Sequence, residues 1–130
     1  MSMIWLMIAA ASAANCADVA DYNAMLTCQK NEADLADGEM NRVWKALRTK
    51  MQALDRETAQ DAKPGEPGHG EALLASQRTW LAFRDAQCRI ASYEWRGGSM
   101  QQFSENRCMA QVTRARTAQL REMLGWSGDR

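Results

Sequence analysis

The stretch QRTWLAFRDAQC, residues 77–88, packs two arginines, two large aromatic side chains and a cysteine into about three helical turns. On a helix each residue advances by about 100°, so Gln77, Trp80, Arg84 and Cys88 share one stripe. The same stripe continues in both directions to include Leu73, Ala91 and Trp95. The spacing therefore predicts an amphipathic helix whose buried face carries an arginine near its middle.

A second apolar stripe precedes this stretch. Between about residues 33 and 58, apolar side chains recur at alternating spacings of four and three, which predicts another amphipathic helix. Its members are Met40, Trp44, Leu47, Met51 and Leu54. The signals between residues 18 and 31 are weaker, and they favour a helix that is either separate from this one or continuous with it.

Glycines and prolines mark the boundaries between the helices. Residues 62–70 contain two prolines and three glycines, which break helical hydrogen bonding, so a Pro/Gly-rich linker is expected there. The helix that contains the opening stretch should run from Glu71 to about Arg96, where Gly97 and Gly98 end it.

A third helix is expected to start at Ser99, with Gln102 completing a capping box, and to end near Leu124. No segment shows the alternating pattern of a β-strand. The sequence thus predicts an all-α fold, a small three- to four-helix bundle, with residues 15–130 forming one domain.

Four cysteines indicate how this small bundle is held together. Their even number predicts two disulfides once the chain is exported, as the export-signal pattern of its N-terminus indicates. Their spacing matches no zinc pattern, so neither a metal nor another cofactor is expected. An antiparallel hairpin that turns at Gly97 and Gly98 would bring Cys88 level with Cys108. Cys16 would then pair with Cys28 by elimination, although the sequence leaves the other pairings open.

The N-terminus has the pattern of an export signal. An apolar run is followed by small residues, so residues 1–14 are expected to be a signal peptide and the protein to be periplasmic or secreted. The run is too short for a membrane span, which needs about 20 residues. Basic and acidic residues number 16 each, a balance that does not indicate nucleic-acid binding.

Two arginines lie on apolar helix faces. Arg84 belongs to the stripe of the predicted helix 71–96, and Arg116 lies among apolar residues of the predicted helix 99–124. A buried guanidinium keeps its charge and therefore needs a carboxylate or several carbonyls. Asp37, on the apolar face of the first helix, is the expected partner of Arg84, and Asp55 is similarly placed further along. Asp85 is expected either to pair with Arg116 or to lie on the helix surface.

We interpret this constellation as an internal salt bridge rather than as an anion-binding or acid–base site, because both arginines are centred among apolar neighbours. The aromatic side chains of Trp44, Trp80 and Phe83 are interpreted as core.

The motifs LLASQRTWLAFRDAQC (73–88), GGS (97–99) and VTRARTAQL (112–120) resemble the lysozyme inhibitor LprI-like family. The N-terminal half agrees through NC (15–16), LTCQ (26–29) and ADGEMNRVW (36–44). Carried over position by position, the resemblance selects Cys16, Cys28, Asp37, Asn41, Trp80, Arg84, Cys88, Cys108 and Arg116. It implies a small exported helical module of bacteria, with a lysozyme-inhibiting role in some members.

Two functions follow from these observations. The first is inhibition of a lysozyme by an exposed element, either the linker around His69 or the turn of Gly97, Gly98 and Ser99, which Arg96 flanks. The linker is also interpreted more simply, as a flexible connection. The second is a non-inhibitory protein-interaction module of the cell envelope.

The second function would use an exposed aromatic patch that contains Tyr93, Trp95 and Trp126. An enzyme is not expected, because the one histidine lies in the linker and the cysteines are assigned to disulfides. The pattern does not indicate an oligomeric state.

Overall fold

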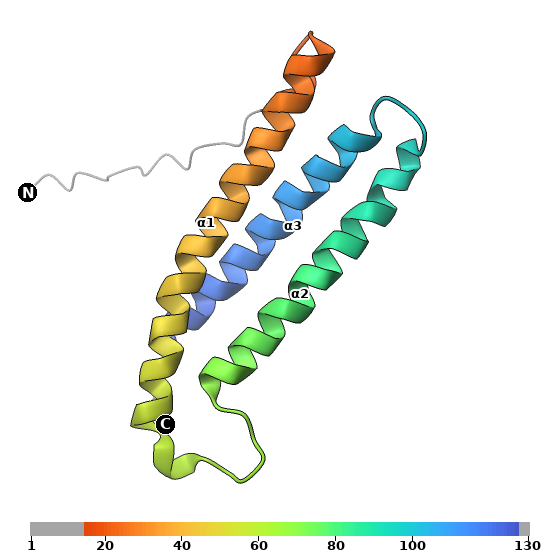
Figure 1. Cartoon of the computed structure of the whole chain (residues 1–130). Coiled ribbons are helices and arrows are strands. Elements are labelled where there is room, and N and C mark those ends of the chain that lie inside the picture. Colours follow the sequence, from red (N-terminus) through yellow and green to blue (C-terminus); the bar gives the residue numbers. More distant parts are fainter. Residues whose placement is uncertain (1–14, 128–130) are drawn as a thin grey trace, which may run out of the picture.

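The computed structural model describes residues 15–127, which fold into a three-helix bundle (Figure 1). The helices are α1 (Tyr22–Glu57), α2 (His69–Ser92) and α3 (Gln101–Leu124). Short 3-10 helices, η1 (Cys16–Asp18), η2 (Ala59–Asp61) and η3 (Tyr93–Trp95), flank them. Residues 15–127 contain no strand, which confirms the predicted all-α class. The predicted signal peptide at residues 1–14 lies outside the described residues.

The longest element is α1, one continuous helix of 36 residues that includes residues 22–31 of the weakly predicted region 18–31. Its N-terminus is capped by Asp21, whose carboxylate accepts a hydrogen bond from the backbone N–H of Ala24 at 2.8 Å. At the other end, the Thr58 hydroxyl donates to the carbonyl of Leu54 at 2.7 Å. At 1.5 Å per residue, α1 is about 54 Å long and spans the whole bundle.

In Figure 1, α2 and α3 form an antiparallel hairpin, and α3 lies between α2 and α1. The hairpin turns at η3 and at Gly97, whose φ of 77° is the left-handed conformation that favours glycine. The α-helix therefore ends at Ser92, earlier than the predicted Arg96, because its last turn tightens into the 3-10 form.

The predicted capping box at Ser99 is wrong. Helix α3 begins at Gln101, and Met100 occupies the N-cap position without a side-chain hydrogen bond. The carbonyl of Ser99 instead accepts a hydrogen bond from the Tyr22 hydroxyl of α1. The Gln101 amide oxygen accepts the backbone N–H of Gly97 at 3.0 Å, so this side chain closes the turn.

The linker is shorter than predicted. Its last two residues, His69 and Gly70, already belong to α2. A helix can begin there because Asp55 of α1 accepts both of their backbone N–H groups, at 2.6 Å and 3.0 Å, and so replaces a local cap.

The main core lies where the predicted α1 stripe meets α2 and α3. Four of the five stripe residues are buried, and Trp44 packs half-buried beside them. This cluster contains Met40, Val43, Leu47, Met51, Leu54, Leu73 and Leu120. The interpretation of Phe83 as core is wrong, since its exposed fraction is 55%. It lies about 100° around α2 from Arg84 and so turns away from the other helices.

Both predicted disulfides are present. The Cα atoms of Cys88 and Cys108 are 5.4 Å apart across the α2–α3 hairpin, and those of Cys16 and Cys28 are 5.5 Å apart. Around Cys16, a second small cluster with Met25 and Phe103 fixes the segment before α1 to the start of α3.

Candidate protein-binding surface

The Arg84 side chain lies in the groove between the three helices, and only 13% of it is exposed. Its Nη1 donates to Asp37 Oδ1 of α1 at 3.3 Å and lies 3.5 Å from Thr113 Oγ1 of α3. Its Nε donates to Asp85 Oδ1 at 3.2 Å. The structure therefore places Arg84 beside Asp37, the carboxylate expected from the sequence. Asp85 accepts a hydrogen bond from Arg84 rather than from Arg116.

Arg116 is buried without a carboxylate, so of the two roles expected for Asp85, pairing with Arg116 or lying on the helix surface, the first is wrong. Its Nε donates to Gln77 Oε1 at 3.0 Å, Nη2 donates to Ser76 Oγ at 3.0 Å, and Nη1 donates to Gln119 Oε1 at 3.3 Å. Burial lowers the pKa of the guanidinium. Of the two kinds of partner that a buried guanidinium can use, a carboxylate or several neutral oxygens, Arg116 uses the second, on α2 and α3.

Trp80 connects the two arginines. The guanidinium carbons of Arg84 and Arg116 lie 5.3 Å and 5.8 Å from the centroid of its ring, within the range of cation–π contacts. Asn41 donates to the second oxygen of Asp37 at 3.3 Å. The five residues selected by the resemblance outside the disulfides therefore form one unbroken series of contacts.

These five contacting residues form a polar layer that lies only partly inside the bundle: Trp80, Arg84 and Arg116 are half-buried or buried, whereas Asn41 and 48% of the Asp37 side chain are exposed. A hollow of about 240 Å³ opens beside Asp37 and Arg84, but both groups already bond to each other or to their neighbours. The polar layer therefore joins the helices and leaves little free bonding capacity for a ligand.

The α2–α3 turn, residues 93–100, presents a different kind of surface. The Arg96 guanidinium stacks on the Tyr93 ring, 4.6 Å from its centroid, and Trp95 is 48% exposed. Hydrogen bonds close the turn, including one from the backbone N–H of Gly98 to the Trp95 carbonyl at 2.8 Å. The Cys88–Cys108 disulfide braces the helices below it. The turn is therefore an exposed, well-braced element that combines a cation with aromatic rings.

His69 lies at the opposite end of α2 from this turn, at the start of a 24-residue helix about 36 Å long (Figure 1). Its ring Nδ1 lies 3.0 Å from Asp55 Oδ1. The structure thus separates His69 from Arg96, Gly97 and Gly98, and it gives the histidine a structural contact rather than a place in a flexible linker.

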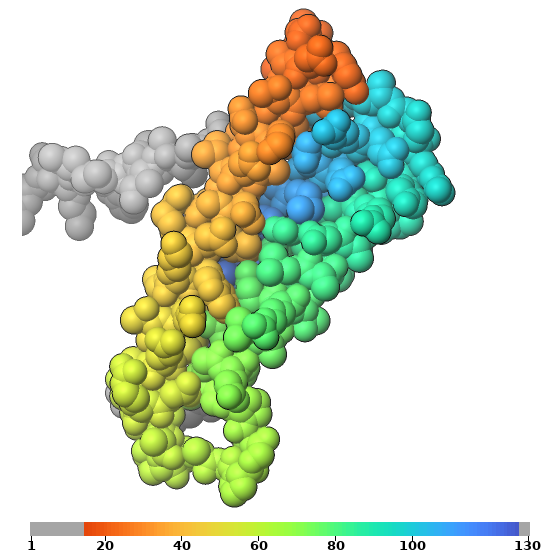
Figure 2. Space-filling model, viewed as in Figure 1, coloured from red at the N-terminus to blue at the C-terminus, as the bar shows by residue number. Residues whose placement is uncertain are grey.

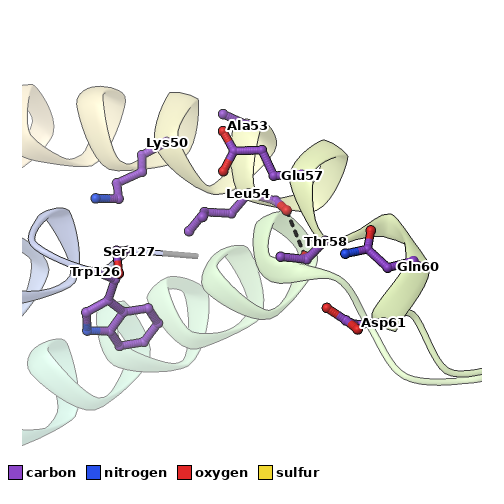
Figure 3. A pocket seen from close by; sticks show the side chains of 9 residues that line it. All are labelled: Lys50, Ala53, Leu54, Glu57, Thr58, Gln60, Asp61, Trp126 and Ser127. Carbon is purple, nitrogen blue, oxygen red and sulfur yellow. Dashed lines mark hydrogen bonds between the residues drawn. The ribbon is translucent and has the colours of Figure 1, made fainter. Parts of the chain in front are cut away.

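The expected aromatic patch is also divided. Trp126 follows the C-terminus of α3, whereas Tyr93 and Trp95 precede its N-terminus, so the helix separates them. Trp126 lines an open hollow of about 610 Å³ at the far end of the bundle, opposite the last turns of α1 and η2 (Figure 3). The hollow lies near the end where Figure 2 shows a gap between α1 and the start of α2. The remaining lining residues are Lys50, Ala53, Leu54, Glu57, Thr58, Gln60, Asp61 and Ser127.

Two other kinds of site are absent from the part of the chain that the structure describes. Within residues 15–127, no group of histidine, cysteine and acidic side chains is arranged to hold a metal ion. In the same part of the chain, no helix is both long and apolar enough to cross a membrane.

The structure therefore defines a class of protein: a small helical bundle held by two disulfides that presents a braced turn at one end. The sequence comparisons specify the family. Residues 13–120 match the family model described as "Lysozyme inhibitor LprI", and the chain belongs to that family. Its disulfides and its family both indicate an extracytoplasmic protein.

Two bacterial relatives are similar over most of the chain. An uncharacterized protein of Rhizobium meliloti (strain 1021), R02472, is 39% identical over 97 residues, which cover 75% of this chain and 69% of the relative. The uncharacterized protein YecT of Escherichia coli (strain K12) is 31% identical over 110 residues, which cover 82% of this chain and 66% of the relative. The matched region thus spans about two thirds of each relative. No solved structure is significantly similar to the chain.

Proposed function

We propose that this protein is an exported, non-catalytic binding module that inhibits a lysozyme, and that the α2–α3 turn enters the enzyme's cleft. Family membership supports an inhibitor, and the two disulfides suit a protein that folds outside the cytoplasm. We assign export to residues 1–14 and the binding module to the domain that follows.

The observation that carries the proposal is the Arg96 side chain stacked on Tyr93 at the tip of a braced turn. Rigid elements lose little conformational entropy on binding, and arginine, tyrosine and tryptophan are the residues most enriched at binding hot spots. The turn contains all three residue types, with Trp95 beside the stacked pair.

The chemistry of the target explains why the cation matters. Lysozymes cleave glycosidic bonds with two carboxyl groups, one a general acid and the other a nucleophile or electrostatic stabiliser. A guanidinium that enters the cleft would form charge-assisted hydrogen bonds with these carboxylates. It would also hold the general acid in its ionised form, which cannot protonate the leaving group.

A non-catalytic role agrees with how the reactive side chains are used. His69 contacts Asp55 at the start of α2, and the four cysteines are paired in disulfides. The arginines of the polar layer bond to neighbouring helices.

The test is a titration of the oxidised protein into cell-wall lysis assays with lysozymes of several structural classes. We expect saturable inhibition of at least one class at about one-to-one stoichiometry. Arg96→Ala should weaken inhibition at least about tenfold, because it removes a charged hot-spot group. Arg48→Ala, which removes an exposed arginine from the C-terminal half of α1, is the matched control and should inhibit like the unmodified protein.

Absence of inhibition across the whole panel, with both disulfides and helical content verified, would refute the inhibitor assignment and favour the non-inhibitory envelope module. If Arg96→Ala inhibits as strongly as the unmodified protein, the protein is still an inhibitor, but its contact with the lysozyme lies outside the α2–α3 turn.

A further inference from the structure

The outer side of α2 carries an exposed stripe of which only two residues are used elsewhere in the fold: Ser76, which accepts a hydrogen bond from Arg116, and Tyr93, which stacks with Arg96 in the α2–α3 turn. Its residues recur at alternating spacings of four and three along the helix and into η3. All of them are exposed and none is charged, with exposed fractions of 55% for Phe83, 60% for Ile90 and 38% for Tyr93. We call these residues the outer α2 stripe: Ala72, Ser76, Thr79, Phe83, Ala86, Ile90 and Tyr93.

This spacing is the heptad pattern by which one helix packs along another. In this bundle the stripe has no such helix, because the buried residues of α2, including Leu73, Gln77 and Cys88, lie on another side of it. Figures 1 and 2 show α2 at one edge of the molecule, and its inner side meets α3 and α1. An exposed helix face normally carries charged residues. An uncharged heptad stripe therefore indicates a surface that another molecule covers.

We propose that the outer α2 stripe pairs two copies of this protein through antiparallel packing of α2 against α2. The sizes of the side chains favour this partner. In antiparallel pairing centred between Arg84 and Asp85, Phe83 of one copy lies opposite Ala86 of the other. The same register sets Ile90 opposite Thr79 and Tyr93 opposite Ser76.

Each layer of this pair therefore combines a large side chain with a small one, which fills space evenly. Parallel pairing would instead oppose Phe83 to Phe83 and Ala86 to Ala86, alternating crowded layers with empty ones. The antiparallel arrangement uses the same patch on both copies, as a two-fold symmetric dimer requires. It also buries no charged residue of the stripe, so no desolvated charge opposes association.

The exposed area of the stripe is sufficient for a weak specific dimer. Given the exposed fractions of its three large residues and the small exposed residues between them, the stripe offers roughly 500 Å² per copy, or about 1,000 Å² in total. That total lies at the lower limit for a specific interface. We therefore expect a dissociation constant in the range of about 1–100 μM.

Antiparallel pairing would place the two α2–α3 turns at opposite ends of the dimer. This inference does not depend on the proposed inhibition, since self-association is measured without any lysozyme.

Sedimentation velocity of the oxidised protein between about 1 and 500 μM tests the pairing. We expect the average mass to rise from that of a monomer toward that of a dimer. Ala86→Arg places a charge at the centre of the stripe and should keep the protein monomeric throughout. Leu35→Arg, at an equally exposed apolar residue of α1, is the control and should dimerise like the unmodified protein. Circular dichroism melting of dilute samples should show that Ala86→Arg folds normally.

The register is tested with Thr79→Cys and Ile90→Cys, each in the oxidised protein and treated with a short bismaleimide. A mixture of the two variants should crosslink, whereas each variant alone should not, because like positions lie about 16 Å apart along the helix in the antiparallel pair. Crosslinking of each variant alone would establish parallel pairing and refute this arrangement. A monomer at every concentration, or a dimer that survives Ala86→Arg, would overturn the proposal.

Discussion

Asp55 of α1 caps the first turn of α2 through His69, fourteen positions further along the chain. Its Oδ1 accepts the backbone N–H of His69 at 2.6 Å and lies 3.0 Å from the ring Nδ1 of the same residue. Its Oδ2 accepts the backbone N–H of Gly70 at 3.0 Å. One carboxylate of α1 therefore caps the N-terminus of α2 and links the two helices. Protonation of this carboxylate should lower the free energy of unfolding.

The hydrogen bonds from Gly70 and His69, the former being the larger cause, lower the pKa of the Asp55 carboxyl. Because the folded pKa lies below the unfolded value, this group stabilises the fold fully above the unfolded pKa of about 3.9. That contribution is lost as the pH falls through the folded pKa. Asp55→Asn should therefore cost about 0.5–2 kcal/mol at pH 7, and the difference from the unmodified protein should shrink below about pH 4.

Urea unfolding at pH 7, 5, 4 and 3 measures this difference, with Asp61→Asn, an exposed carboxylate of η2, as the control. A cost of Asp55→Asn that stays constant over this range would show that the capping carboxylate does not titrate as proposed.

The same cap explains why residue 68 is a glycine. A Cβ at Gly68 would lie 2.8 Å from Asp55 Oδ1, closer than real contacts allow, and the hydrogen bonds at Asp55 leave that carboxylate little room to move. We expect Gly68→Ala to destabilise the fold by about 1 kcal/mol or more. Gly38→Ala is the matched control: its Cβ would meet nothing nearer than 3.8 Å in the middle of α1, so it should stabilise by about 0.5–1 kcal/mol. Equal effects of the two changes in thermal melting would contradict the packing argument.

The Arg84–Asp37 pair should show energetic coupling. In a double-mutant cycle with Arg84→Leu and Asp37→Leu, we expect a coupling energy of about 0.5–1 kcal/mol, modest because 48% of the Asp37 side chain is exposed. A cycle that combines Arg84→Leu with Glu39→Leu is the control, because Glu39 pairs with Arg121 and not with Arg84. Additive losses in the Arg84–Asp37 cycle would remove this pair as a link between α1 and α2.

The two disulfides should contribute unequally. Replacing Cys88 and Cys108 together by alanine opens a loop closed across 20 positions and frees the hairpin below the α2–α3 turn, which should cost about 3 kcal/mol. Replacing Cys16 and Cys28 together frees only the short segment before α1, which can detach while the bundle stays folded, so we expect a loss below about 2 kcal/mol. Guanidinium unfolding ranks the two double variants, and the reverse order would show that the N-terminal segment is the more important brace.

The periodic features of the chain were predictable because they are local. The apolar stripe on α1 and the arginines on α2 and α3 follow from side chains three and four positions apart, which share a face on any helix. The Cys88–Cys108 pairing followed from equal distances to one turn. The family resemblance carried by these residues agrees with the family model that the chain matches.

Other features depend on how the helices are rotated and crossed, which local spacing does not encode. Asp55 was recognisable as a carboxylate on an apolar face, but its role appears only where the end of α1 meets the start of α2. Arg116 bonds to Gln77 rather than to Asp85 because these two residues lie at different angles around α2. Gln77 faces Arg116 on α3, whereas Asp85 lies beside Arg84.

The sequence by itself determined the helical class, the Cys88–Cys108 pairing and the buried stripe of α1, since each depends on intervals along one helix or one hairpin. Only the tertiary structure decided which polar groups satisfy Arg116, and that His69 and Arg96 lie beyond opposite ends of the α2 core contacts. It also decided that Phe83 belongs to an uncovered outer stripe. The physical reason is that a helix face becomes core or surface only when neighbouring helices pack against it, and their positions are set by contacts between residues far apart in the chain.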